Sequence, residues 1–82
     1  MPHVTVQVVP GHSEEEKRRL AEALHLAVQR ELHTEGKWVS VSIQEVPSEQ
    51  WPSFIRAVPG SSFYVPPAYL EEEQKEDTQE PV

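Results

Sequence analysis

Pro2 is the residue of this chain with the most unusual potential chemistry, because it can become the amino terminus. Removal of the initiator methionine is usual when a small residue follows, and it leaves Pro2 as a free secondary amine at the start of a strand-like segment. A free α-amino group titrates at about pH 8, and desolvation in an apolar pocket lowers the pKa of an amine toward neutrality. Such an amine acts as a base or a nucleophile. A proline at position 2 is also compatible with chance and no function. The surrounding sequence pattern therefore decides between a catalytic Pro2 and a chance occurrence.

The histidines are the next residues with possible chemistry. His3 follows Pro2, and it either orients a substrate by hydrogen bonding or lies in a subunit interface. His12 precedes a predicted helix, where backbone donors and the helix dipole favour an anion, so it is either a substrate contact or an exposed loop residue. His25 and His33 lie two helical turns apart and cannot share a metal within one subunit, so we expect surface residues. No Cys/His pair has zinc spacing, and no metal site is expected.

A strand followed by a helix positions these residues. Residues 3–9 alternate valine with polar side chains, which is typical of a half-buried strand, and Pro10 and Gly11 end it. Ser13 and Glu16 have the spacing of a capping box, so a helix is predicted to begin there. Apolar residues at helical spacing extend this amphipathic helix from about Glu14 to His33; they are Leu20, Ala23, Leu24, Ala27, Val28 and Leu32.

A second strand completes the predicted unit. Gly36 is expected to supply the left-handed stop of the helix, residues 39–46 alternate again, and Pro47 ends them. A helical crossover of this length joins parallel neighbours in a right-handed unit, so the expected fold class is α/β (α+β), a β-α-β subunit with parallel strands and one long helix. The sheet face opposite the helix is polar and uncharged; it presents His3, Thr5, Gln7, Ser40, Ser42 and Gln44. We interpret it as a subunit interface, since a two-stranded sheet with one covered face is marginal.

Composition limits the remaining possibilities. The 82 residues have no cysteine and a net charge of −7, so one small domain without disulfides is expected, supported by oligomerisation. Residues 71–82 carry six acidic and one basic side chain, and residues 1–70 carry eight and six. We therefore predict a domain over residues 1–70 and an acidic disordered tail over residues 71–82. The acidic balance argues against nucleic acid, and the lack of a long apolar run or signal peptide predicts a cytoplasmic protein without a membrane span.

The segment from Trp51 to Leu70 combines aromatic residues with prolines. It is too apolar for a linker and too interrupted for a long helix, so we predict a short irregular C-terminal segment that wraps the core or a neighbouring subunit. Arg56 lies in this segment, and it either supplies a cation to a site across an interface or is a solvated charge. Trp51 is either the wall of a pocket or a subunit contact.

The ordered set of these features resembles the 4-oxalocrotonate tautomerase family throughout residues 2 to about 55. The resemblance rests on the Pro2–Val6 segment, the Pro10–Lys17 segment, the Leu20–Leu32 helix, the Val39–Val46 strand and Trp51. It is closest to a small bacterial subgroup that begins Met-Pro-His and has a tryptophan shortly after the second strand.

This resemblance implies a β-α-β subunit that assembles into dimers or into hexamers built from dimers. It implies that Pro2, after loss of Met1, moves a proton between an enol and the carbon next to a carbonyl, and it implies no cofactor. Well-known members use two arginines to bind the substrate carboxylate, and the matching positions here are His12 and Ser40. Ser40 is either a weak substrate contact or a structural residue. The aromatic residue that walls the pocket in the family matches Trp51.

The loss of both arginines shapes the expected substrate. An arginine guanidinium stays charged and binds a carboxylate with two hydrogen bonds, whereas a histidine is charged only part of the time and a serine is neutral. We therefore expect a small 2-keto or enol monoacid such as phenylpyruvate. The segment after Trp51 is long enough to cap an assembly, which together with the subgroup resemblance favours a homodimer over a hexamer. Two alternatives stay open: a hydratase or dehalogenase of the same superfamily, and a non-catalytic homo-oligomer that kept the fold.

Overall fold

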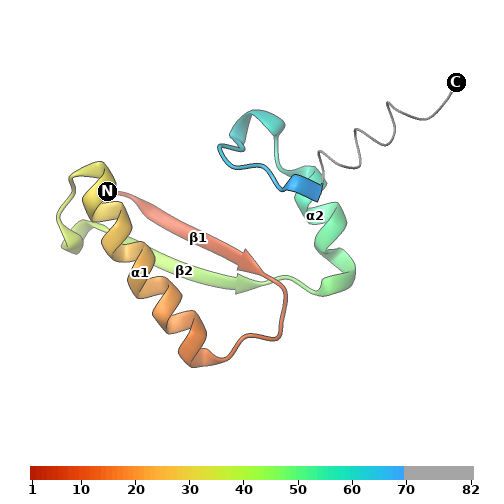
Figure 1. Cartoon of the computed structure of the whole chain (residues 1–82), viewed down its shortest axis with the longest axis horizontal. Helices are drawn as coiled ribbons and strands as arrows, with labels where there is room; N and C mark the ends of the chain where they lie inside the picture. Colours follow the sequence, from red (N-terminus) through yellow and green to blue (C-terminus); the bar gives the residue numbers. More distant parts are fainter. Residues whose placement is uncertain (70–82) are drawn as a thin grey trace, which may run out of the picture.

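The computed structural model describes residues 1–69, which form a two-stranded parallel sheet with one long helix packed on it (Figure 1). The elements in chain order are β1 (His3–Val8), α1 (Glu14–Leu32), η1 (Gly36–Trp38), β2 (Ser40–Glu45), η2 (Ser48–Gln50), α2 (Trp51–Ala57) and η3 (Gly60–Ser62). The predicted β-α-β order and the parallel pairing are confirmed. The division into a domain over residues 1–70 and a tail stays a prediction, since segment 71–82 lies outside the described residues.

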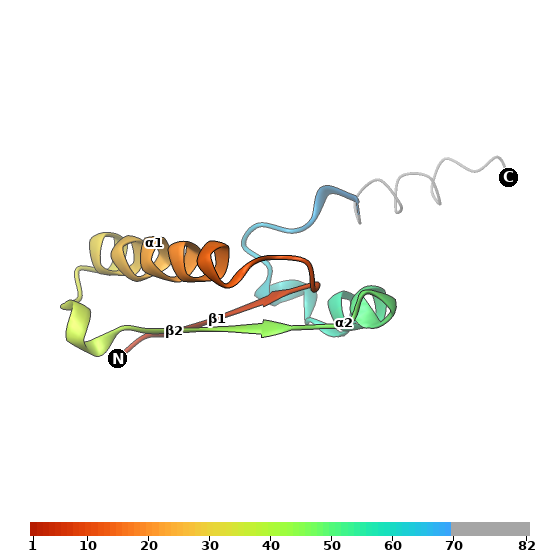
Figure 2. The same ribbon diagram turned by 90° about the horizontal axis from the view of Figure 1, so that it is seen from below.

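The sheet has one face toward α1 and one face that no element of residues 1–69 covers (Figure 2). The polar residues of the two strands stand opposite one another on this second face, paired as His3 with Ser40, Thr5 with Ser42 and Gln7 with Gln44. The Gln7 side chain donates to Gln44 over 3.3 Å, and the Ser42 hydroxyl donates to Thr5 Oγ1 over 3.4 Å. The cross-strand polar pairs thus satisfy part of their hydrogen-bonding capacity within the face itself.

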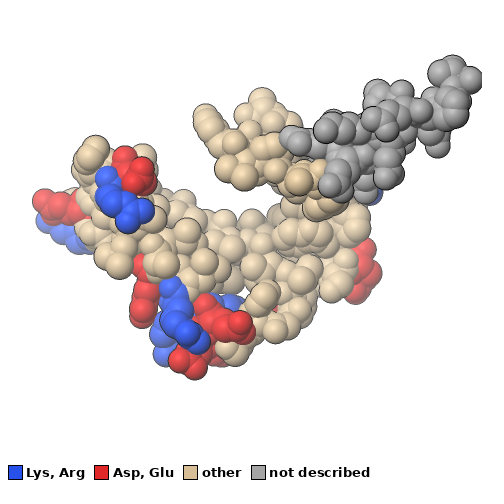
Figure 3. Space-filling view, in the orientation of Figure 1, with Lys and Arg blue, Asp and Glu red and all other residues tan. Residues whose placement is uncertain are grey.

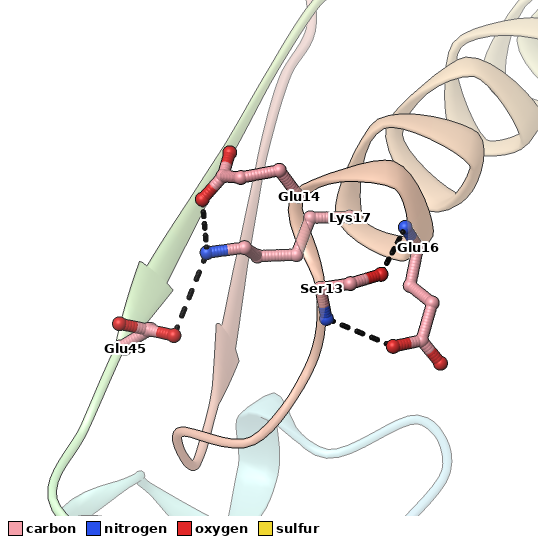
Figure 4. Close-up of polar contacts among 5 residues, drawn as sticks. All are labelled: Ser13, Glu14, Glu16, Lys17 and Glu45. Carbon is pink, nitrogen blue, oxygen red and sulfur yellow. Dashed lines mark hydrogen bonds and ion pairs between the residues drawn. The ribbon is translucent and has the colours of Figure 1, made fainter.

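The predicted capping box starts α1 (Figure 4). The Ser13 amide donates to Glu16 Oε1 over 2.8 Å, and the Glu16 amide donates to the Ser13 hydroxyl over 3.1 Å. The hydrogen bonds from the Ser13 backbone, and then those of its side chain, hold the pKa of the Glu16 carboxyl below its usual range. Lys17, also near the start of α1, has its Nζ 2.9 Å from Glu14 and 3.5 Å from Glu45. These ion pairs tie the start of the helix to the end of β2.

Replacing Ser13 with alanine is expected to lower the free energy of unfolding by about 1 kcal/mol, because the Glu16 amide then loses its acceptor at the end of the helix. Urea denaturation at a fixed protein concentration measures this loss. Ser61→Ala is the matched control, since Ser61 is exposed and outside α1, and it is expected to change the value by less than about 0.5 kcal/mol. Equal stability of the two variants would show that the box contributes nothing.

Helix α1 ends at Leu32, next to the predicted His33, but the residue that stops it differs from the prediction. His33, not Gly36, takes the left-handed conformation, with φ 55° and ψ 49°, and its amide donates to the Gln29 carbonyl. Gly36 lies in η1, where a Cβ would stand 2.9 Å from the end of the Gln29 side chain. The glycine therefore does not terminate the helix but lies close against the side chain of Gln29 in α1.

The inward side of α1 is also narrower than its apolar pattern indicates. Leu24, Ala27 and Val28 are half-buried as predicted, but Leu20, Ala23 and Leu32 are exposed. The prediction of His25 as a surface residue is wrong, because its Nε2 donates to the Gly36 carbonyl over 2.9 Å and the ring is half-buried. Among residues 1–69 the sheet under the helix has two strands, so it covers a strip too narrow for the whole row of apolar side chains.

The described part of the chain has a very small core. Val39 is its one buried apolar residue, with 7% of its surface exposed, and the inward valines of the strands are half-buried. The segment after β2 includes the short helix α2, which the prediction of an irregular segment did not foresee, and Pro52 stands in its first turn. Within residues 1–69, no helix has the length and apolarity to cross a membrane. So little burial fits the expectation that further subunits support the fold.

Candidate active site

Pro2 lies at the start of β1, beside the first residue of β2. Its side chain is half-buried, and its carbonyl accepts a hydrogen bond from the Ser40 amide over 3.2 Å. Met1 precedes it with 93% of its surface exposed. While Met1 is attached, the Pro2 nitrogen is an amide nitrogen that carries no proton and is not basic. The exposed methionine leaves this peptide bond accessible to an aminopeptidase.

The structure brings two further candidate residues next to Pro2. His3 and Ser40 pair across the strands, and His3 Nδ1 lies 2.6 Å from the Ser40 hydroxyl. His3 Nε2 lies 3.1 Å from the Ser42 hydroxyl, so both ring nitrogens have partners on the uncovered sheet face. This geometry fixes the imidazole beside the amino-terminal end of the sheet, and it fits both interpretations of His3, a substrate contact and an interface residue.

The other three candidate residues lie at the opposite end of the sheet. His12 follows β1, and Trp51 and Arg56 belong to α2, which lies beyond the end of β2 (Figure 1). Each strand has six residues, and at about 3.3 Å per residue the two ends of the sheet are roughly 20 Å apart. One subunit therefore does not bring Pro2 together with His12, Trp51 or Arg56.

The surroundings of these three residues differ. His12 lines a narrow hollow of about 90 Å³ together with Val8, Leu20 and Ile43. The Trp51 ring is half-buried against Phe54, with centroids 5.5 Å apart. Arg56 is exposed in the last turn of α2, where a cation interacts favourably with the helix dipole.

A second hollow lies at the amino terminus, and sequence reasoning missed it. It has a volume of about 450 Å³ and is lined by Met1, His33, Thr34, Glu35 and Trp38. The signal was available in the sequence: these residues directly precede the second strand, and in a parallel unit the starts of both strands lie side by side. Figure 3 shows the basic and acidic side chains in two main groups, one at the left near the amino-terminal end of the strands and a larger one at the bottom near the start of α1, while the surface over the strands is largely uncharged.

Titratable side chains line the hollow at the amino terminus. Within residues 1–69, no group of three or more histidine or carboxylate side chains is arranged to hold a metal ion. The hollow brings the Trp38 indole, the Glu35 carboxylate and the His33 imidazole together with Met1, the residue that precedes Pro2.

Comparisons with known proteins agree with this architecture. The family model described as "Tautomerase enzyme" matches residues 2–52. A "Probable tautomerase" of Xylella fastidiosa (strain 9a5c) is 33% identical over 51 residues, which are 62% of this chain and 62% of that protein. The chain thus spans less than two thirds of the length of this curated relative.

Two solved structures have a similar fold. TomN, a 4-oxalocrotonate tautomerase homologue in the tomaymycin biosynthetic pathway, is 36% identical, with a TM-score of 0.59 over 61% of this chain and 77% of TomN. YwhB, a homologue of 4-oxalocrotonate tautomerase, is 29% identical, with a TM-score of 0.59 over 76% of this chain and 98% of YwhB. These matches do not test the Met-Pro-His subgroup, which stays a prediction.

Proposed function

Because this chain belongs to the tautomerase family, we propose that it is a keto–enol tautomerase that uses the amine of Pro2 after Met1 has been removed. The observation that carries the proposal is the position of Pro2. Its carbonyl accepts a hydrogen bond from the Ser40 amide at the start of β1, and the neighbouring hollow, which Met1 lines, widens when Met1 is removed. A base in such a place keeps its direction toward a bound substrate, which general acid–base catalysis requires.

The reaction needs one proton and no cofactor. The neutral Pro2 nitrogen takes the proton from the enol hydroxyl, and the electron pair of that O–H bond forms the carbonyl while the double bond shifts its electrons toward the adjacent carbon. The Pro2 ammonium returns the proton to that carbon, which restores the neutral amine. The reverse direction uses the same two steps, so the amine serves as both base and acid.

The complete site requires a second subunit. His12, Trp51 and Arg56 lie roughly 20 Å from Pro2 within one chain, so they reach a substrate at Pro2 only from a neighbouring copy. The uncharged sheet face allows two copies to meet without burying a charge. We propose a homodimer in preference to a hexamer, with these three residues contributed across the interface.

The substrate is proposed to be a small monoacid, such as phenylpyruvate. His12 and Ser40 occupy the positions at which the better-known relatives are expected to hold arginines, and neither provides a permanent positive charge. At these two positions a dicarboxylate therefore meets no permanent cation. An aromatic monoacid needs only one carboxylate partner and more apolar contact, which Trp51 supplies.

Two measurements on the wild-type protein test this function. The intact mass is expected to lack one methionine, and the protein is expected to accelerate phenylpyruvate tautomerisation well above the buffer rate, more than it accelerates a dicarboxylate such as 2-hydroxymuconate. Turnover of the dicarboxylate at an equal or higher rate would contradict the monoacid class. Retention of Met1 would leave Pro2 as an amide and exclude it as the base.

A non-catalytic homo-oligomer is the second candidate function. It is favoured by one observation, that the candidate residues form two separate groups within the subunit. The two functions differ in the same assay: a purified protein with the Pro2 amine free and no rate above buffer would support the non-catalytic oligomer.

A further inference from the structure

A lysine and a tryptophan lie together beside the amino terminus, and the proton transfer proposed for Pro2 uses neither of them. Lys37 Nζ lies 5.0 Å from the centroid of the Trp38 ring. Trp38 is 46% exposed, and it lines the hollow that Met1 also lines. A half-exposed indole with a cation over its ring offers an apolar surface and a positive charge side by side.

The turn that carries these two side chains is fixed to the rest of the fold. The Gly36 carbonyl in η1 accepts hydrogen bonds from His25 Nε2 over 2.9 Å and from the Val39 amide over 3.1 Å. The Gly36 backbone also lies against the end of the Gln29 side chain. The turn is therefore tied both to α1 and to the residue before β2.

The same turn leads directly to the backbone that holds Pro2. The Ser40 amide donates to the Pro2 carbonyl over 3.2 Å, two residues after Trp38. We propose that Lys37 and Trp38 form the substrate subsite of the Pro2 amine, in which Lys37 binds the carboxylate and Trp38 contacts the aryl group of an aromatic 2-keto or enol acid. This inference rests on the proposed function and names the residue that supplies the positive charge missing at His12 and Ser40.

Glu35 gives the subsite a feature that can be tested. Its Oε2 lies 3.6 Å from Lys37 Nζ, and both side chains are exposed. A ligand carboxylate therefore competes with Glu35 for the same ammonium group. Removal of the Glu35 charge is expected to strengthen ligand binding, whereas removal of the Lys37 charge is expected to weaken it. A general disturbance of the turn cannot produce these opposite effects.

The test uses 3-phenylpropanoate, which has the carboxylate and the aryl group but no keto group to react. Calorimetric titration of the full chain is expected to give a Kd about tenfold higher for Lys37→Gln, and about two- to fivefold lower for Glu35→Gln. Lys37→Arg keeps the charge and is expected to retain most of the affinity. Arg19→Gln is the control. It removes an exposed cation that pairs with Glu15 in the first half of α1, away from η1, and it is expected to leave Kd unchanged.

The role of Trp38 is tested with a second acid. Trp38→Leu is expected to weaken 3-phenylpropanoate binding by about fivefold, because the stacking surface for the aryl group is lost while the Lys37 ammonium remains. Binding of hexanoate, which has no ring, is expected to change less than twofold. Equal losses for both acids would overturn the assignment of Trp38 to the aryl group.

The outcomes separate this subsite from the proposed function. Absence of binding to the wild type, or equal affinities of the wild type and Lys37→Gln, would overturn the subsite even if phenylpyruvate is turned over. The expected order of affinities without any tautomerisation would support the subsite and reject the proposed function. In an active enzyme, Lys37→Gln is expected to raise KM about tenfold with little change in kcat, since binding rather than proton transfer is affected.

Discussion

Replacing Pro2 with alanine is expected to lower kcat/KM for phenylpyruvate tautomerisation by about a hundredfold, and blocking the amine altogether is expected to cost up to about 10⁴-fold. Alanine still leaves an amine after methionine removal, but its nitrogen rotates freely, whereas the proline ring fixes the direction of the lone pair. A chain extended by residues before Met1 keeps Pro2 as an amide. In that protein the side chain is unchanged and only the basic nitrogen is lost.

The control for these variants is Pro10→Ala, since Pro10 is an exposed residue in the loop between β1 and α1. It is expected to leave the rate unchanged, so a loss specific to position 2 reports chemistry rather than a general effect of proline removal. Initial rates of enol loss, measured with intact masses for each preparation, give the comparison. Equal rates in the wild type and in the extended chain would exclude the Pro2 amine from the reaction.

The fold was largely predictable because its local signals agree with one another. Alternation of valine with polar residues predicted both strands to within about two residues, and the Ser13–Glu16 spacing predicted the start of α1. The residue that stops α1 was less predictable, since glycine adopts the left-handed conformation more readily than histidine. Here the Thr34 amide supports the turn at His33 by donating to the Gln29 carbonyl over 3.2 Å, a hydrogen bond typical of helices that end in a left-handed residue.

Helix α2 escaped prediction because prolines were interpreted as breaks. Pro52 stands in the first turn of this helix, where a missing amide hydrogen costs nothing and the fixed φ favours helix entry. The position of a proline within an element, rather than its presence, decides its effect. The same reasoning identifies Pro2 as a residue that starts a strand without interrupting it.

The candidate site was predictable only in part, because spacing along the chain does not give distance across a sheet. The parallel register explains why Pro2, His3 and Ser40 are neighbours. It equally explains why His12 and Trp51, which follow the two strands, lie at the other end. Lys37 and Trp38 carry no motif and become notable only once the start of β2 is placed beside the amino terminus.

A negative charge at the centre of the uncovered sheet face is expected to prevent assembly. Thr5 is exposed within the subunit and faces Ser42, so Thr5→Glu costs the isolated chain little. In a homodimer that buries this face, the carboxylate would lose its water without gaining a cation, which costs several kcal/mol. We therefore expect the dissociation constant to rise by at least about a hundredfold, measured by sedimentation velocity across a range of protein concentrations.

The matched control for this variant is Ala23→Glu, which places the same charge on the exposed side of α1. It is expected to sediment like the wild type. Because the described core contains a single buried apolar residue, Thr5→Glu is also expected to unfold at lower urea concentrations, and its loss of catalysis should follow its loss of assembly. An active, fully assembled Thr5→Glu protein would place the subunit contact elsewhere and would remove the reason for bringing Trp51 and Arg56 of one copy to the Pro2 of another.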